Sequence, residues 1–552
     1  MRKNEFNFAS ALSGFALGAV VTLLASVAVL PAADDGGGGR GLVPLAVGAG
    51  GAGVDPGDLE LGEGEQLALD ESGNTVVVDD SGSVVRTVSG GGGGGSDAGG
   101  GATGGGGTGG VAGSGVSVGG GAGGTSGGSG GEGGAGSGDG CRGGATDVGV
   151  TESEIKLGAT IAETGIARSF LGEVRQAMEA VRNKVNRTGG ICGRQLVIKY
   201  KDDAWSADTG ARYIQNLVEG EKVFALAVSP SSEGLNQASN QGYFKAQGVP
   251  VVGADGLNVT QFKDPMIFPV AAATITTVDV MMKNAWDRGA RNPAIVFGNT
   301  YRFGVEGAYA FNATYKKLSG GKDIPGYKNP LASGGGGCTE RFCGVSSTEG
   351  QYGPRVSSLN SACSEEPKCD FLLLLLEPKT AQDWMSVPGV WTPSQYEKAG
   401  MAGPQPLFTY DFGRNCADKC AGMWMWTGYN PPIEQYASSP AVKTFVADLK
   451  AQSASADHFN QFTMGGYVGM QVLVEALKQA GGELTRAKLI ETLNSMAPIN
   501  TGLTTTPLSW RADARHANKA AQAFEVQSKN GFTGWRFKQP PIVDPYLGEH
   551  TG

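Results

Sequence analysis

Residues 148–160 have the sequence VGVTESEIKLGAT, and residues 186–203 complete the same unit as NRTGGICGRQLVIKYKDD. Every second residue from Ile155 to Ala159 is apolar, which predicts a strand with one buried face. Apolar residues then recur at helical spacing from Phe170 to Val185, and Gly189-Gly190 ends that helix. A second alternating run leads to Asp202-Asp203. The order strand, helix, strand predicts two neighbouring parallel strands in an α/β sheet.

The same two strings resemble the start of periplasmic-type solute-binding proteins of the branched-chain amino acid family. A G-V-T-x-x-E-I-x-x-G opening, here residues 149–158, and a G-G-I-x-G-R turn, here residues 189–194, are typical of that family. The resemblance covers residues 149–537, with sparse identity after the opening unit. It implies a two-lobed periplasmic-binding-protein type I fold, with two doubly wound parallel sheets joined by hinge crossings. It also implies a small-molecule ligand, an ABC transporter permease as partner, and no cofactor.

The N-terminus carries a targeting element. An apolar run from Phe8 to Leu30 follows the basic residues Arg2 and Lys3. The run is long enough to cross a bilayer core of about 30 Å, and its basic end should stay cytoplasmic. We therefore expect residues 1–33 to be a signal anchor that holds the protein at the cell surface. The alternative is a cleaved signal peptide with a site near Pro31-Ala32-Ala33, which would give a secreted protein.

Two segments separate this element from the folded region. Residues 34–89 are of low complexity and are expected to be mostly disordered, with a possible hairpin formed by two β-branched runs within residues 67–88. Residues 90–140 hold 31 glycines in 51 positions. Such a composition predicts a flexible linker with a root-mean-square span of roughly 40 Å.

The folded region is expected over residues 141–540, followed by a tail at 541–552. We predict a first lobe at about 149–271 and 432–510, and a second at about 272–431 and 511–540. The predicted strands lie at 223–228, 249–253, 294–298, 371–376 and 407–410, with a hairpin-like pair at 524–526 and 535–537. Residues 319–351 are rich in glycine and predict a surface insertion.

Eight cysteines all lie at or beyond residue 141, and an even number in an exported chain favours disulfides. Close spacing favours three local pairs, which leaves the first two cysteines to pair with each other. A zinc site is the weaker alternative, because the spacings do not match paired C-x2-C and no histidine accompanies them. The expected pairs are Cys141–Cys192, Cys338–Cys343, Cys363–Cys369 and Cys416–Cys420.

Charge and motif content exclude several function classes. The net charge is −9 without any cluster of Lys or Arg, so nucleic acid is not expected as a partner. The three histidines form no metal-like pair and accompany no nucleophile motif. We therefore expect no metal, no catalytic residue and no enzyme activity.

In the first lobe, candidate ligand contacts follow the predicted strands. Ser229, Ser231 and Ser232 precede a helix, where hydroxyl and N–H groups suit a carboxylate, although one serine could simply cap the helix. The resemblance places ligand contacts in the next loop too, at Asp255 and Leu257. An acid in that loop would repel a carboxylate, which argues against an ordinary amino acid as ligand.

The remaining candidates are aromatic or acidic. In the second lobe, Tyr301 and Phe303 follow the first predicted strand, and Glu377 follows the run of leucines. The resemblance assigns Asp411 to hold an α-amino group through a charge-assisted hydrogen bond; the alternative is a solvated loop aspartate. Trp205 and Phe170 are expected either as aromatic walls of the cleft or as core residues.

These features together predict a membrane-tethered extracellular solute-binding protein. It would capture an amino-acid-like or amphipathic molecule in an interlobe cleft by hinge closure and deliver it to an ABC importer. The alternative is a surface ligand sensor or an adhesion or scaffold module that uses the same fold without transport.

Overall fold

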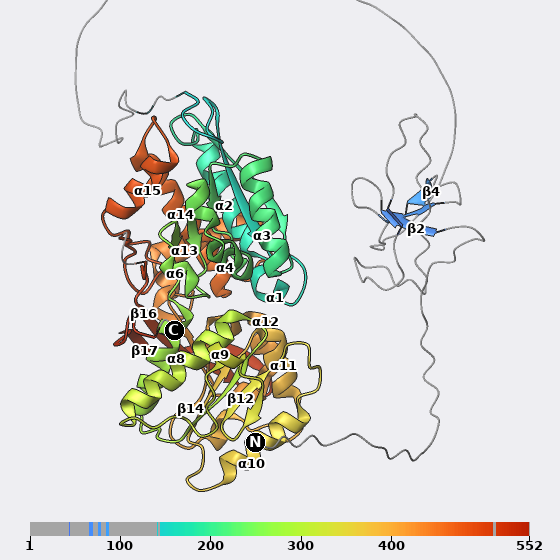
Figure 1. The fold of residues 1–552 in the computed structure, drawn as a ribbon, viewed down its shortest axis with the longest axis vertical. Helices are drawn as coiled ribbons and strands as arrows, with labels where there is room; N and C mark the ends of the chain where they lie inside the picture. The colour runs from blue at the N-terminus through green and yellow to red at the C-terminus, as the bar shows by residue number, and fades with distance from the viewer. Residues whose placement is uncertain are drawn as a thin grey trace, which may run out of the picture. The chain divides into compact units, whose positions relative to one another are not determined.

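The computed structural model describes Cys141, residues 144–511 and residues 515–550, together with four short strands nearer the N-terminus (Figure 1). These four strands belong to a separate compact unit, residues 1–128. They form an antiparallel sheet in the order β1-β2-β3-β4. Their bounds are β1 Val43–Pro44, β2 Gln66–Leu69, β3 Thr75–Val78 and β4 Val84–Thr87.

β3 and β4, which are antiparallel partners, lie within the two runs for which a hairpin was predicted. β2 and β1 extend it, whereas little structure was expected outside the hairpin. The expected anchor, residues 1–33, and the expected linker, residues 90–140, lie outside the described residues. In the part of the chain that is described, no helix has both the length and the apolar content needed to cross a membrane.

The first sheet of the larger unit has five parallel strands in the order β6-β5-β7-β8-β9. β5 and β6 pair along their whole length, which confirms the strand–helix–strand unit predicted from the sequence. The inner strands β7 and β8 are buried throughout, as continuous apolar sequence predicts for a covered parallel strand. The bounds are β5 Glu154–Ile161, β6 Gln195–Asp202, β7 Ala225–Ala227, β8 Val251–Ala254 and β9 Ile267–Pro269.

The second sheet has eight strands in the order β11-β12-β10-β13-β14-β15-β16-β17. Its central strands are parallel, but β11 at one edge pairs antiparallel with β12, and β16 near the other edge pairs antiparallel with both β15 and β17. The sheet is therefore mixed, not parallel throughout as the family resemblance implies. The bounds are β10 Pro293–Gly298, β11 Gly337–Thr339, β12 Phe342–Val345, β13 Phe371–Leu375, β14 Gly400–Gly403, β15 Trp424–Thr427, β16 Ala520–Ser528 and β17 Phe532–Val543.

Two sequence predictions about this sheet are wrong. Residues 319–351 are not only a surface insertion, because β12 lies within them and pairs with β10 as a buried strand. No strand spans 407–410, where a 3-10 turn ends at Leu407 and a helix begins at Tyr410; the strand of this region is β14. β14 reads Gly-Met-Ala-Gly, which lacks the β-branched and aromatic residues that mark strands in sequence.

Helices divide between the two sheets, and we call each sheet with its helices a lobe. In lobe 1, α14 packs against α2 and β8, and α13 against α2; in lobe 2, α7 packs against α8, β15 and β16. The chain thus enters lobe 2 after β9, returns to lobe 1 after β15, and ends in lobe 2. The bounds are α1 Arg168–Leu171, α2 Val174–Arg187, α3 Ala207–Gln215, α4 Ser232–Asn240, α5 Tyr243–Gln247, α6 Thr260–Lys263, α7 Thr274–Asp287, α8 Arg302–Leu318, α9 Pro330–Ser333, α10 Gly353–Ser364, α11 Pro378–Ser386, α12 Tyr410–Cys416, α13 Pro440–Gln452, α14 Gln461–Ala480 and α15 Arg486–Ser495.

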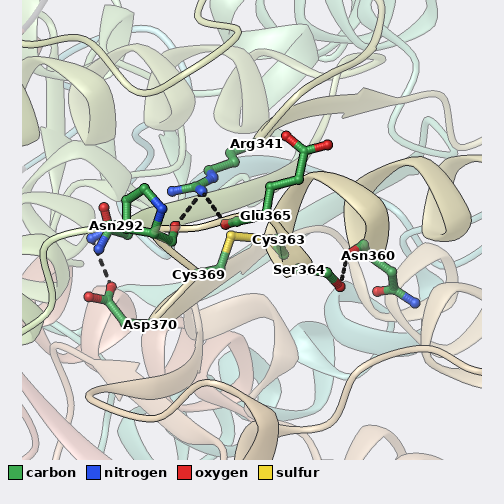
Figure 2. Close-up of a disulfide and its surroundings, with 9 residues drawn as sticks. Asn292, Arg341, Asn360, Cys363, Ser364, Glu365, Cys369 and Asp370 are labelled. Carbon is green, nitrogen blue, oxygen red and sulfur yellow. Dashed lines mark hydrogen bonds between the residues drawn. A yellow bond between two sulfur atoms is a disulfide. The ribbon is translucent and has the colours of Figure 1, made fainter.

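Four disulfides join the cysteine pairs predicted from the sequence. Cys141–Cys192 ties the start of the folded unit to the turn before β6, and the other three are local pairs in lobe 2. Figure 2 shows the Cys363–Cys369 loop, in which Arg341 donates to the backbone carbonyl of Glu365. Asp370, directly after the loop, accepts from the backbone N–H of Asn292 at 2.9 Å. These bonds fix the approach to β13.

Candidate functional site

The loops that follow the strands of the two sheets meet at the lobe boundary. In lobe 1, Asp203 follows β6, Ser229 follows β7 and Asp255 follows β8; in lobe 2, Tyr301 follows β10 and Glu377 follows β13. The carboxyl ends of parallel strands share one edge of a sheet, and open α/β sheets bind ligands at that edge. In this protein the carboxyl-end edges of the two sheets face each other, because side chains from the loops of one sheet contact side chains from the loops of the other.

Trp205 is the centre of the aromatic contacts between the lobes. Its indole stacks on the ring of Tyr301, with centroids 4.0 Å apart and 27° between the planes. Phe170 meets the indole edge-on at 5.4 Å, and Phe303 lies 6.0 Å away. Tyr301 is half-buried and the other three are buried. Of the predicted contact residues, these four are therefore brought together, and they are packed between the lobes.

Two of the strand-end loops have strained backbone. Ala204 and Trp205 have φ values of 50° and 62°, and Val228 and Ser229 have 61° and 41°. Left-handed backbone is uncommon for residues other than glycine and costs about 1–2 kcal/mol per residue. Strain of this kind concentrates at functional sites, where surrounding contacts hold it in place. Both loops lie at the lobe boundary.

The three predicted serines make different contacts. The Ser229 hydroxyl accepts from the backbone N–H of Thr160 at 3.3 Å, and the Ser232 hydroxyl accepts from the indole N–H of Trp205 at 3.1 Å. Ser231 holds the N-cap position of α4, but its hydroxyl donates to Asp203 at 2.6 Å instead of capping the helix. The hydroxyls therefore organise the boundary loops.

Buried carboxyl groups gather at the same boundary. Burial raises the pKa of Asp255 and of Glu377 to about 7, and that of Asp203 to about 6. One carboxyl oxygen of each has no hydrogen-bond partner among the described residues: Asp203 Oδ2, Asp255 Oδ2 and Glu377 Oε2. Burying an ionised carboxylate without a partner is unfavourable. These atoms therefore have unused capacity to bind a donor.

Two further acids join the lobes directly, and the sequence analysis missed both. Glu233 on α4 accepts from the backbone N–H of Arg302 at 3.3 Å. Glu306 on α8 accepts from the backbone N–H of Val259 at 2.8 Å and pairs with the Arg302 guanidinium at 2.7 Å. Both carboxylates are buried, and burial raises their pKa. Nothing local in the sequence marks them, since each acts on a residue distant in the chain.

A cavity of about 1320 Å³ is lined by residues of both lobes, and its lining includes none of the four aromatic residues or five buried acids described above. The predicted residue Asp411 lies in it, exposed in the first turn of α12. Nearby, the backbone N–H of Tyr410 donates to Asp457 of lobe 1 at 2.8 Å. The charged side chains of the lining balance: Arg168, Lys379, Arg414 and Lys450 against Glu163, Glu173, Asp411 and Asp457.

Two of the predicted contact residues lie outside the aromatic cluster. Asp411 lines the cavity and does not contact Trp205. Leu257, in the loop after β8, is buried in the hydrophobic core. The backbone N–H of Leu257 donates to Asp255 at 3.1 Å, so Leu257 helps to fix that carboxylate. Among the described residues, no group of three metal-ligating side chains is present.

A family model described as "Periplasmic binding protein" matches residues 154–333 and 394–531 of the chain. Among solved structures, a solute-binding protein of an ABC transporter from Rhodopseudomonas palustris HaA2, in complex with p-hydroxybenzoic acid, has a TM-score of 0.58 at 16% identity. The alignment covers 72% of this chain and 99% of the Rhodopseudomonas protein. A search of curated proteins finds no match.

Two other solved structures are similar. A fatty acid ABC transporter substrate-binding protein from Thermomonospora curvata has a TM-score of 0.57 at 18% identity, over 74% of this chain and 96% of its own. A branched-chain amino acid transporter substrate-binding protein from Streptococcus pneumoniae, in complex with isoleucine, has a TM-score of 0.55 at 14% identity. It covers 70% of this chain and 100% of its own. At such identities the likeness concerns the fold.

Proposed function

The chain belongs to the periplasmic binding protein family, and on this premise we propose that it is a solute-binding protein of an ABC importer. It captures a small molecule between its two lobes and presents it to a membrane permease. The observation that carries the proposal is the meeting of two strand-end edges, which buries polar atoms without a hydrogen-bond partner among the described residues.

The chemistry of the boundary supports a ligand with both a polar and an apolar part. Aromatic rings from both lobes supply apolar surface, and buried carboxyl groups supply polar contacts. The similar structures named above hold isoleucine and p-hydroxybenzoic acid, and each of these combines a charged group with an apolar body. We therefore propose an amino-acid-like or amphipathic ligand.

Hinge closure is the proposed mechanism. The bonds from Val259 to Glu306, from Arg302 to Glu233 and from Tyr410 to Asp457 join opposite lobes. Three such bonds, spread over both ends of the boundary, hold the lobes closed. A ligand that contacts both edges adds to them and so shifts the population toward the closed form. The closed form is the one that docks on the permease.

We also propose that the protein is tethered to the outer face of the membrane. The apolar run from Phe8 to Leu30 would anchor it, and the glycine-rich residues 90–140 would let the binding unit reach the permease. A linker of this composition would span roughly 40 Å.

A thermal-shift screen of the full-length protein in mild detergent tests ligand capture. We expect at least one amino acid, amide, amine or organic acid to raise the melting temperature, because a ligand that binds only the folded state stabilises it. A flat response to the whole panel argues for a surface sensor or scaffold without solute capture. Retention of the protein in the membrane pellet after carbonate washing tests the tether.

A further inference from the structure

The lobe boundary has a surplus of acidic groups over basic ones. Five carboxyl groups are buried there, and of these Glu306 pairs with Arg302. Asp203, Asp255 and Glu377 make no ion pair with any described residue. The nearby bases Lys263 and Lys379 are exposed, and they lower the pKa of Glu306 and of Glu377 less than burial raises it. The five acids are Asp203, Glu233, Asp255, Glu306 and Glu377.

The boundary also has a surplus of hydrogen-bond acceptors. Besides one oxygen of each unpaired acid, Asn258 Oδ1 has no donor, although this side chain is fully buried and its amide donates to Glu233. Buried side-chain N–H groups without a partner do occur in the described residues, but none lies in the loops after β5–β8, β10 or β13. They belong to Arg182, Arg194, Trp384, Arg515, His516, Trp535 and His550. The hydroxyl of Thr160, at the end of β5, is also unpaired among the described residues and can either donate or accept.

A buried polar atom is normally hydrogen-bonded, so unpaired acceptors call for a donor. An ammonium group brings three donors and no acceptor, and a guanidinium brings five donors. A carboxylate would add acceptors where acceptors are already in excess. We propose that the ligand is an organic cation, an amine or guanidinium compound with an apolar body, and that it carries no carboxylate. This inference rests on the proposed solute-binding function and narrows it.

The aromatic residues support the same charge. Phe170, Trp205, Tyr301 and Phe303 lie together at the boundary, and a cation within about 6 Å of an aromatic face is attracted by the ring. Tyr301 lies within electrostatic reach of both Glu377 and Glu233, because both raise the pKa of its phenol after burial. Tyr301 therefore lies close both to the other rings and to two of the acids.

The start of α4 is the place where a carboxylate would find backbone donors. Here, however, the buried acid Glu233 lies in the first turn of the helix. Asp203 also lies close to the start of α4, because its carboxylate accepts a hydrogen bond from Ser231 at the N-cap position. An anion at this helix start would meet two carboxyl groups at close range, and like charges in a buried site repel strongly.

Matched compounds test the inference by isothermal titration of the full-length protein. Tyramine and tyrosine, 3-methylbutylamine and leucine, and agmatine and arginine each differ by one carboxylate. 4-Hydroxybenzoate and 4-methylpentanoate serve as anions. We expect at least one amine to bind, at least tenfold more tightly than its amino acid, and neither anion to bind.

Tighter binding of an amino acid or an anion would overturn the cation inference and leave the proposed solute-binding function intact. An absence of binding by every compound counts against both. Glu377→Gln and Asp255→Asn should each weaken binding of the amine at least tenfold. The exposed Glu491→Gln on α15 should leave it unchanged, and circular dichroism checks that each variant folds.

The pH dependence gives a readout that does not depend on variants. A cation needs ionised carboxylates, so its affinity should rise as the pH increases from 5.5 to 8. If neutral carboxyl groups instead donated to an anion, affinity would fall over the same range. A falling profile for the compound that binds would therefore overturn the inference.

Discussion

Trp205 of lobe 1 and Tyr301 of lobe 2 stack face to face across the lobe boundary, with ring centroids 4.0 Å apart. They come from loops that follow β6 and β10, in different sheets. Trp205 is also fixed by its bond to Ser232 and by the edge of Phe170. In the proposed binding mode, a solute between the strand ends would contact or displace this pair.

Replacing Trp205 with alanine should therefore destabilise the protein. The indole is buried, and removal of a buried tryptophan typically lowers the free energy of unfolding by about 3–5 kcal/mol. Urea unfolding followed by circular dichroism measures the change. Trp391→Ala is the matched control, because Trp391 is only partly buried at the outer edge of lobe 2 and should cost less. Equal losses in the two variants would contradict the central position of Trp205.

Removal of the Glu306 side chain should open the lobes. Glu306→Ala loses both the bond from the Val259 N–H and the ion pair with Arg302. Small-angle X-ray scattering of the unliganded protein should show a larger radius of gyration. Asp287→Ala, which breaks an exposed ion pair with Lys283 on α7, should leave the radius unchanged. An unchanged radius in Glu306→Ala would show that other contacts hold the lobes closed.

Asp255→Asn should stabilise the unliganded protein at high pH. Burial raises the pKa of Asp255 to about 7, above the usual value near 4, so the folded state holds a proton that the unfolded state releases. This lowers stability as the pH rises from about 4 to 7, and the loss is complete above pH 7.

We expect the asparagine variant to gain of the order of 2 kcal/mol at pH 8, using about 1.4 kcal/mol per pKa unit and allowing for an unpaired amide. The gain should shrink as the pH falls below 7, and below about pH 4 only the cost of the unpaired amide, about 2 kcal/mol, should remain as a loss of stability. Chemical unfolding at several pH values measures it. A gain that does not depend on pH would assign the effect to packing, not to the charge.

Loss of the Cys141–Cys192 disulfide should lower stability more than loss of a local one. It closes a sequence separation of 51, whereas Cys416–Cys420 closes 4. The loop-entropy model gives about 4 kcal/mol for the first and about 2 kcal/mol for the second. Paired serine variants, compared by thermal unfolding under oxidising conditions, test the order. The reverse order would mean that Cys141 contributes little to the folded unit.

Local pattern was enough for much of the fold. The alternation around Ile155, the helical spacing to Val185 and the glycine pair at Gly189 predicted the β5–α2–β6 unit, because each depends on residues a few positions apart. The same reasoning failed at β14, whose small residues carry no periodic pattern. It also failed at β12, since a short strand inside a glycine-rich segment gains its stability from pairing with β10.

The order of β5, α2 and β6 could be predicted from residues 148–203 alone, and close spacing favoured the four cysteine pairs that the structure contains. Which side chains meet depends on the packing of the two lobes. Glu306 and Val259 are 47 residues apart, and Trp205 reaches Tyr301 in another lobe. The surplus of buried acceptors appears only after folding, because burial and partners depend on the packing of one lobe against the other.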